Sequence, residues 1–226
     1  YERNTVFSIT SAAWGTLSSA TFPTTVRNQD IFPASNATSE FGSALSLFQN
    51  RLSFDVAYYK IDMKDFIVSA STSSASGFSN NYINSKEKRR RDGIEATLNV
   101  TPLKTKDWKL DLGFNWTTYK TIYTKLDSLY SGDKPWIKVG ERTDFYLYND
   151  YLKDPEGNII HNSSGLPQYS SYLSNAGYSD PKYIWGINAN LSYKNLDLSI
   201  SADGRVGGLA QTITEMYMWR SGSHPN

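Results

Sequence analysis

Hydrophobic and polar residues alternate along six segments of the chain. In the longest uninterrupted case, residues 107–117, every second position is polar or glycine and the others are Trp108, Leu110, Leu112, Phe114 and Trp116. A period of two places successive side chains on opposite faces of a β-strand, which no helix does. The pattern recurs, less cleanly in the first case, near residues 40–48, 51–61, 93–101, 183–193 and 196–205. The sequence therefore predicts an almost all-β chain of six strands, with a weak seventh candidate at residues 4–10.

The connections between these strands alternate between short and long. Short turns join the strands in pairs, at residues 49–50, 102–106 and 194–195. Long segments separate the pairs, at residues 11–39, 65–90, 122–182 and from 206 onward. These long segments are rich in Ser, Asn, Gly and Tyr, which is typical of loops. Outer-membrane barrels combine short periplasmic turns with long extracellular loops, so the arrangement favours an antiparallel transmembrane β-barrel fragment.

The two faces of the predicted strands differ in chemistry. An eleven-residue strand tilted by about 45° spans roughly 25 Å, close to the apolar band of a membrane barrel. The apolar faces often end in Trp or Tyr, which prefer the membrane interface. Charged groups are expensive in lipid but not in a wet lumen. We therefore expect these polar side chains to face the lumen: Glu95, Asp111, Asn115, Asn188, Asn190 and Asp197.

Composition excludes several other classes of protein. Apolar residues make up 39% of the chain, mean hydropathy is −0.50, and no apolar run is long enough for a membrane helix. A net charge of +1 gives no reason to expect a nucleic-acid partner. With no cysteine and only two histidines, the sequence offers neither a disulfide framework nor an obvious metal centre. We find no catalytic spacing, and expect no enzyme activity, cofactor or metal.

Four segments, in order, resemble the C-terminal half of the barrel in SusC/RagA-type TonB-linked outer-membrane transporters of Bacteroidota. They span about residues 36–210, and each motif alone is weak. The first is Glu40-Phe-Gly with residues 47–60, and the second is residues 93–104 with Trp108 and Phe114-Asn-Trp. The third is residues 154–160 with Gly165-Leu-Pro, Gly177 and Asp180-Pro-Lys-Tyr-Ile-Trp-Gly, and the fourth is residues 191–199 with Asp203-Gly-Arg-Val-Gly-Gly.

The resemblance implies that residues 1–226 are part of one barrel domain, contributing six to seven of about 22 strands. It implies multi-pass location in the bacterial outer membrane, in contact with lipid. It also implies import of a glycan- or peptide-derived nutrient, driven through TonB and a plug domain, with a SusD-like surface lipoprotein covering the barrel. The plug, a signal peptide and the terminal strands have no counterpart in this sequence, so we expect it to be an internal piece of a longer protein.

Two further features need an interpretation. The long segment 122–182 is dense in aromatic residues, and we select Trp136, Tyr146, Tyr148 and Tyr169 as candidates for contact with an oligosaccharide or peptide substrate, or with the lid. Alternatively, these rings pack the loop against its neighbours. The basic run Lys86–Arg91 is expected to lie where a loop meets a strand at the membrane rim.

One alternative fold remains open at this point. A soluble β-sandwich that binds carbohydrate through exposed Trp and Tyr would show the same alternation. In that fold the apolar rows would be buried against a second sheet. In a barrel they would not be covered by protein.

Overall fold

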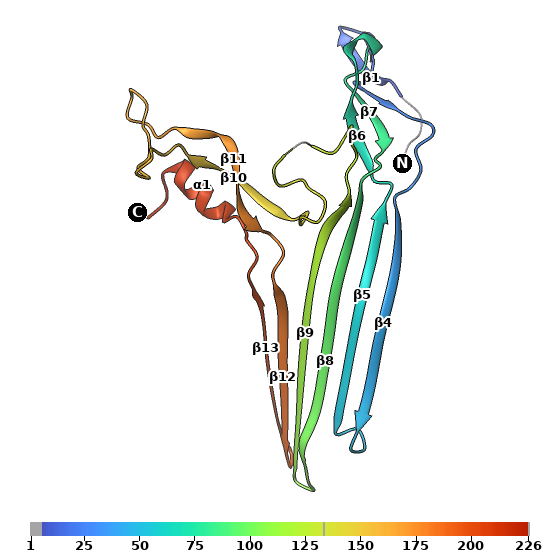
Figure 1. Cartoon of the computed structure of the whole chain (residues 1–226), viewed down its shortest axis with the longest axis vertical. Coiled ribbons are helices and arrows are strands. Elements are labelled where there is room, and N and C mark those ends of the chain that lie inside the picture. Colours follow the sequence, from blue (N-terminus) through green and yellow to red (C-terminus); the bar gives the residue numbers. More distant parts are fainter. Residues whose placement is uncertain (1–5, 133, 226) are drawn as a thin grey trace. The chain divides into compact units, whose positions relative to one another are not determined.

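The computed structural model describes residues 6–132 and 134–225, and its regular structure is almost entirely β. The largest sheet has six strands in the order β13-β12-β9-β8-β5-β4 (Figure 1). Their bounds are β4 (Ser35–Leu47), β5 (Leu52–Lys64), β8 (Lys88–Lys104), β9 (Trp108–Lys125), β12 (Tyr183–Tyr193) and β13 (Leu196–Val206). All six predicted strands are confirmed. The three short turns also lie together at one end of the sheet (Figure 1).

Four of these strands are longer than the alternation predicts. At the end away from the turns, β4, β5, β8 and β9 continue for three or more residues past the predicted limit. In β8 the added residues, Lys88–Asp92, are polar on both faces. The backbone can go on pairing after the side chains have stopped alternating, so the end of the pattern is not the end of the strand.

The long segments contain regular structure of their own, which corrects the expectation of plain loops. A hairpin of β1 (Ser8–Trp14) and β2 (Leu17–Thr21) begins at residue 8, so the weak strand candidate is only partly met, and residues 4 and 5 lie outside the described residues. The remaining elements are β3 (Thr25–Arg27), β6 (Ile67–Ser71), the 3₁₀ turn η1 (Ser74–Ser76), β7 (Asn80–Asn84), β10 (Phe145–Tyr151), β11 (Tyr169–Tyr178) and helix α1 (Ile213–Ser221). No helix in the described part of the chain is long and apolar enough to cross a membrane.

The chain divides into two compact units. One contains residues 1–39, 59–92 and 121–141, and the other contains residues 40–58, 93–120 and 142–226. In the first unit, β7 pairs in parallel with β3 and antiparallel with β6. The buried apolar side chains of the described residues, Ile31, Ala70 and Tyr123, all belong to this unit.

In the second unit, the register of three strands separates apolar from polar side chains. Between β9 and β12 the apolar pairs include Leu110 with Leu191 and Phe114 with Ile187. At each end of this row an aromatic pair is in contact, with ring centroids 4.2 Å apart for Trp108 and Tyr193 and 6.3 Å apart for Trp116 and Tyr183. The predicted apolar face is thus continuous across the strands and ends in rings.

This apolar face is not buried by protein in the described residues. Ile187 is 45% exposed, and Leu198 and Ile200 on β13 are 51% and 60% exposed. A sandwich would cover such a row with a second sheet. The exposure therefore contradicts the sandwich alternative and agrees with a row that faces a nonprotein environment.

Candidate functional site

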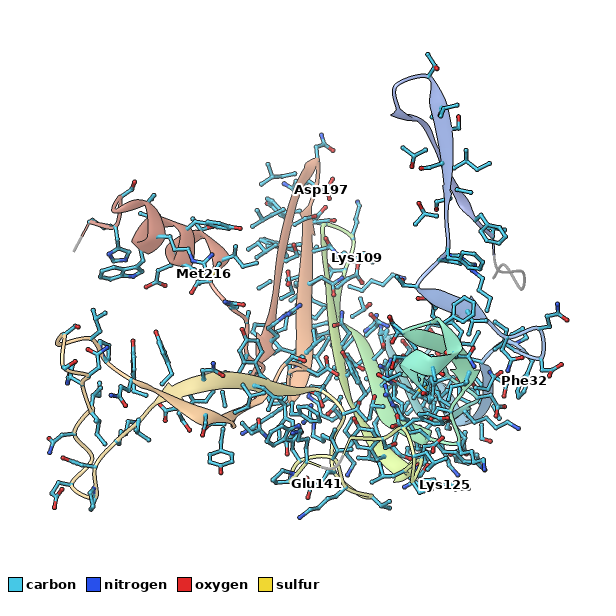
Figure 2. All side chains as sticks on the ribbon, turned by 90° about the horizontal axis from the view of Figure 1, so that it is seen from above. Phe32, Lys109, Lys125, Glu141, Asp197 and Met216 are labelled. Carbon is cyan, nitrogen blue, oxygen red and sulfur yellow. The ribbon has the colours of Figure 1, made fainter. Side chains whose placement is uncertain are left out.

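The opposite face of the same strands carries the polar residues selected from the sequence. Cross-strand pairing aligns them in four rows over β9, β12 and β13. The rows are Lys109–Ser192–Asp197, Asp111–Asn190–Ser199, Gly113–Asn188–Ser201 and Asn115–Gly186–Asp203. Five of the six predicted lumen-facing residues therefore lie on one surface. Figure 2 labels Lys109 and Asp197 in the row nearest the turns.

Glu95, the sixth candidate, belongs to β8 and shares this surface. The hydroxyl of Thr101 on β8 donates to Asp111 Oδ1 at 2.7 Å, which places the odd-numbered side chains of β8 beside the polar rows of β9. Glu95 has the same parity as Thr101 within one continuous strand. All six side chains that the sequence selected are thus brought to one face, where Glu95 and Asn188 are exposed.

Two asparagine side chains lie over glycines of the facing strand. Asn188 is paired with Gly113, and its Oδ1 occupies the place that a Cβ at residue 113 would take. The converse pair places Asn115 Oδ1 at 2.7 Å from the Cβ position of Gly186. The alternation in the sequence could not predict these two asparagine–glycine contacts, because they depend on the register between the strands.

A shallow hollow of about 400 Å³ lies over these asparagine–glycine pairs. Its polar lining comes from β8, β9, β12 and β13, namely Thr97, Asn99, Asn115, Asn188, Ser201 and Asp203. Carboxamides, hydroxyls and one carboxylate can donate and accept hydrogen bonds, so the hollow can bind a polar group. Nearer the turns the polar groups bond to one another, since Ser199 donates to Asn190 Oδ1 at 2.8 Å and Lys109 Nζ lies 2.6 Å from Asp111 Oδ2.

The aromatic candidates divide into two separate groups. Trp136 is half-buried in the first unit, in a segment whose ends meet where Gly140 N donates to Tyr123 O and Tyr123 N donates to Glu141 O. Tyr146, Tyr148 and Tyr169 belong instead to the two-stranded sheet of β10 and β11, called the arm below. The expectation of a single aromatic loop over residues 122–182 is therefore wrong.

The rings of the arm are both packed and exposed. Tyr151 and Tyr169 stack with their centroids 5.0 Å apart, yet Tyr169 remains 60% exposed. Tyr148 is 39% exposed, while Tyr146 is half-buried. Packing within the arm therefore explains part of the aromatic density, and a surface for ligand contact remains.

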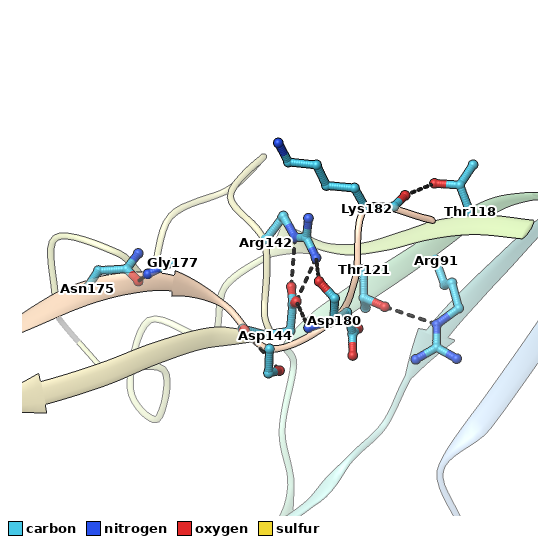
Figure 3. A network of polar contacts seen from close by, with 10 residues as sticks. Arg91, Thr118, Thr121, Arg142, Asp144, Asn175, Gly177, Asp180 and Lys182 are labelled. Atoms are coloured by element: carbon cyan, nitrogen blue, oxygen red, sulfur yellow. Dashed lines mark hydrogen bonds and ion pairs between the residues drawn. The ribbon is translucent and has the colours of Figure 1, made fainter. Parts of the chain in front are cut away.

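The base of the arm is held by a charge network that the sequence did not reveal. Arg142 donates from Nε and Nη2 to the two carboxylate oxygens of Asp144, at 2.8 and 2.6 Å (Figure 3). Its guanidinium also lies 4.2 Å from the ring centre of Tyr178. Burial opposes the charge on Asp144, but Arg142 and the backbone N–H of Asp180 outweigh it and lower the pKa of this carboxyl.

The tip of the arm repeats one turn after eight residues. Gly157 N donates to Asp154 O, and eight residues later Gly165 N donates to Asn162 O. Asp154 Oδ1 and Asn162 Oδ1 each accept a further backbone N–H four residues ahead. The Asp/Asn-x-x-Gly spacing is visible in the sequence and could have identified the repeat.

The two turns close a ring of three backbone hydrogen bonds at the tip. Leu152 N donates to Gln168 O, Gln168 N donates to Ile160 O, and Ile160 N donates to Leu152 O, at 2.8 to 2.9 Å. The three residues are themselves spaced by eight. This closed ring defines the geometry of the tip without an apolar core.

In the first unit, Asp127 fixes the start of the segment that follows β9. This buried carboxylate accepts the backbone N–H of Lys86 at 2.6 Å and the hydroxyl of Ser85 at 3.2 Å. The hydrogen bond from Lys86, supported by that from Leu129, lowers the pKa of Asp127. Within the described residues, no cluster of His, Asp or Glu could hold a metal ion.

The sequence profile of one protein family matches nearly the whole chain. The family is described as TonB dependent receptor-like, beta-barrel, and the match covers residues 4–219. The chain belongs to this family. The family comprises receptors and transporters of the bacterial outer membrane and is not an enzyme class, so the resemblance found in the sequence is confirmed.

A curated relative and two solved structures agree with this TonB-dependent assignment. TonB-dependent receptor P3 of Formosa agariphila is 24% identical over 210 aligned residues, covering 78% of this chain and 21% of that protein. The structure of the RagAB peptide transporter is 18% identical, with a TM-score of 0.68 over 90% of this chain and 24% of that one. The RagAB peptide importer in its open-open state is 20% identical, with a TM-score of 0.71 over 92% and 24% of the two chains.

The chain thus spans about a fifth to a quarter of the length of these relatives. At these identities the solved structures show a shared fold. The six-stranded sheet is a fragment of a TonB-dependent receptor-like β-barrel, with two edge strands, β13 and β4, within the described sheet.

Proposed function

We propose that this chain is part of an outer-membrane barrel that imports a glycan- or peptide-derived nutrient. The observation that carries the proposal is the family match over residues 4–219, together with two chemically opposite sheet faces. The exposed apolar rows contact lipid, and the polar rows face the lumen. This arrangement keeps Asp111, Asp197 and the asparagines out of the hydrocarbon.

The import mechanism involves binding and displacement without bond chemistry. In this proposal, residues 1–226 form part of one barrel domain, and a plug domain elsewhere in the protein fills the lumen. Energy arrives from TonB through that plug. A SusD-like surface lipoprotein covers the barrel, and the structural likeness to the RagAB peptide transporter supports a partner of this kind.

Substrate contacts are assigned to two surfaces. Carboxamides and hydroxyls of the hollow bind polar groups in the lumen, and exposed rings of the arm, such as Tyr148 and Tyr169, stack on substrate or lid. Trp136 and Tyr146 are half-buried, so less of each ring is available for contact with substrate or lid. The structural neighbours are a peptide transporter and a peptide importer, which favours a peptide-derived substrate.

A pair of neighbouring positions tests the assignment of the faces. Ser201 lines the hollow, and Ile200 lies next to it on the apolar face. In the full-length transporter, Ser201→Phe should reduce uptake of defined peptides or oligosaccharides by narrowing the lumen. Ile200→Phe should leave uptake unchanged, because lipid accommodates the ring.

Three measurements complete this test. Outer-membrane fractionation locates the protein, heat-modifiable gel mobility shows that each variant barrel is folded, and the two substrate classes are assayed in parallel. Recovery of the full-length protein as a soluble species, or equal uptake by both folded variants, would overturn the proposal.

A further inference from the structure

The basic run Lys86–Arg91 is divided between two faces by the strand that contains most of it. β8 begins at Lys88 and continues without interruption to Lys104. Side chains alternate along a strand, so Arg89 and Arg91 share the polar face with Glu95. Lys88 and Arg90 continue the row of Ile94, which is the apolar face. One cluster in the sequence is therefore two sets of cations in the structure.

The two arginines of the polar-face set, Arg89 and Arg91, make contacts within the first unit. Arg89 Nε donates to Glu87 Oε1 at 2.7 Å, and its guanidinium lies 4.8 Å from the ring centre of Phe66 and 5.4 Å from that of Tyr123. Arg91 Nε donates to Thr121 Oγ1 at 3.0 Å (Figure 3). These arginines hold neighbouring segments together, so their role is structural.

The apolar-face set is extended by the neighbouring strand β5. The hydrogen bond from Thr101 N to Arg51 O, and that from Asn99 Nδ2 to Ser53 Oγ, show that β5 and β8 run antiparallel with their polar faces on the same side. On β5 the apolar row of Phe54 ends in Tyr58 and is followed by charged residues. These are Lys60, Asp62 and Lys64. The charged stretch of β5 is at the C-terminal end of that strand, and the charged stretch of β8 is at its N-terminal end.

We propose that Lys88 and Arg90, with Lys60 and Lys64 beside them, form a site for the phosphate groups of the outer-leaflet glycolipid. We call these four residues the cationic rim. The proposal rests on the proposed function, because the barrel assignment places the face in contact with lipid. The order along each strand is apolar residues and then cations, which matches the order of acyl chain and phosphate in an anionic lipid.

Carboxylates within the rim hold the cations in place but do not occupy all their donors. Arg90 Nε lies 3.0 Å from Asp92 Oδ2, and Lys60 Nζ lies 3.0 Å from Asp62 Oδ2. Lys64 is 3.7 Å from Asp65, and Lys88 is exposed. A guanidinium has five N–H donors, and an ammonium has three. One carboxylate contact therefore leaves donors that a phosphate can bind.

The test uses full-length transporter in detergent, titrated with lipid A that carries two phosphates and followed by native mass spectrometry. The double variant Lys88→Gln/Arg90→Gln should bind this lipid at least about tenfold more weakly than the wild type. The matched control is Lys104→Gln/Lys106→Gln, which removes the same charge at the turn end of the same hairpin and should bind like wild type. Heat-modifiable mobility confirms that both variants are folded.

Two further probes separate the source of the phosphate. Lipid A without phosphates should bind weakly to wild type, and millimolar inorganic phosphate should displace the phosphorylated lipid only slightly. Equal binding of the two lipids, an equal loss in the control variant, or full displacement by inorganic phosphate would overturn the rim proposal. None of these outcomes affects import, which is measured separately by uptake, so the rim can fail while the proposed function stands.

Discussion

The carboxamide of Asn188 lies over the backbone of Gly113 on the neighbouring strand, in the space that a Cβ at residue 113 would fill. The two residues are cross-strand partners, and the same exchange occurs between Asn115 and Gly186. Each glycine is thus needed by an amide on the facing strand. We call these two asparagine–glycine pairs, at the centre of the polar face, the fitted pairs.

Gly113→Ala should therefore displace Asn188 and destabilise the barrel by about 1–3 kcal/mol, the usual range for overpacking. The measurement is the urea midpoint of the full-length protein in lipid vesicles, read by tryptophan fluorescence. Adding Asn188→Ala removes the clashing group and should recover part of the loss. Strict additivity of the two changes would show that the residues are not coupled.

Leu112→Arg tests the direction of the apolar row. Leu112 is paired with Ala189 near the middle of that row, so an arginine there should cost about 2–4 kcal/mol if the row faces the bilayer midplane. Glu95→Arg on the exposed polar face should change stability little. The free energies of unfolding in vesicles of defined thickness provide the comparison. A larger cost at Glu95 than at Leu112 would reverse the assignment of the two faces.

Gly165→Ala should loosen the tip of the arm. Gly165 has φ of 77° and open space around its Cβ position, so the substitution introduces backbone strain of about 1 kcal/mol without a clash. Hydrogen exchange should become faster at the amides of Ile160 and Gln168, which form the backbone ring. Ser163→Ala in the same turn is the control and should leave both amides protected.

Acid should release the contact between Asp127 and residues 85–86. Because the pKa of Asp127 is lowered in the fold, its stabilising contribution is present above its ordinary pKa near 3.8 and is lost as pH falls through the lowered value. The protection factor of the Lys86 amide, corrected for intrinsic exchange, should be constant from pH 7 to about pH 5. It should fall only below about pH 4.

Asp127→Asn provides the matched comparison at neutral pH. The variant keeps the shape of the side chain but removes the charge, so the Lys86 amide should lose protection already at pH 7. Asp154→Asn, at an exposed turn of the second unit, should not affect that amide. Unchanged protection in Asp127→Asn would mean that the backbone alone holds the segment.

The sequence was sufficient for the strands and their faces, because an apolar row on one face of a strand imposes a strict period of two on residues such as Leu110, Leu112 and Phe114. The sequence was insufficient for the strand residues that lie beyond this alternating row. At Lys88–Asp92 both faces are polar, and strand pairing there depends on the neighbouring backbone. The arm gave no alternation, since β10 and β11 pair through register shifts near Tyr146 and Tyr151.

The fitted pairs of the polar face could not be predicted for a different reason. Asn188 and Gly113 are 75 positions apart in the sequence, and only the register brings them together. The six lumen candidates lie on one face of the sheet, but the hollow, which only Asn115 and Asn188 of them line, depends on which strands are neighbours. Asp127 carried no signal, because most hydrogen-bond partners of its carboxylate are backbone groups and the side-chain partner of that carboxylate, Ser85, is 42 residues away in the sequence.

The eight-residue spacing at the tip of the arm makes the length of that arm modular. Leu152 N already donates to Gln168 O. Ile160 lies between these two residues on the other side of the ring, where its O accepts from Gln168 N and its N donates to Leu152 O. Removing residues 153–160 would leave Leu152 in the place of Ile160, and the ring would reduce to a reciprocal pair that closes an ordinary hairpin. Inserting another unit of eight would lengthen the tip by one more turn. The length of the arm can therefore change in whole units of eight residues while the pairing of β10 with β11 stays as it is.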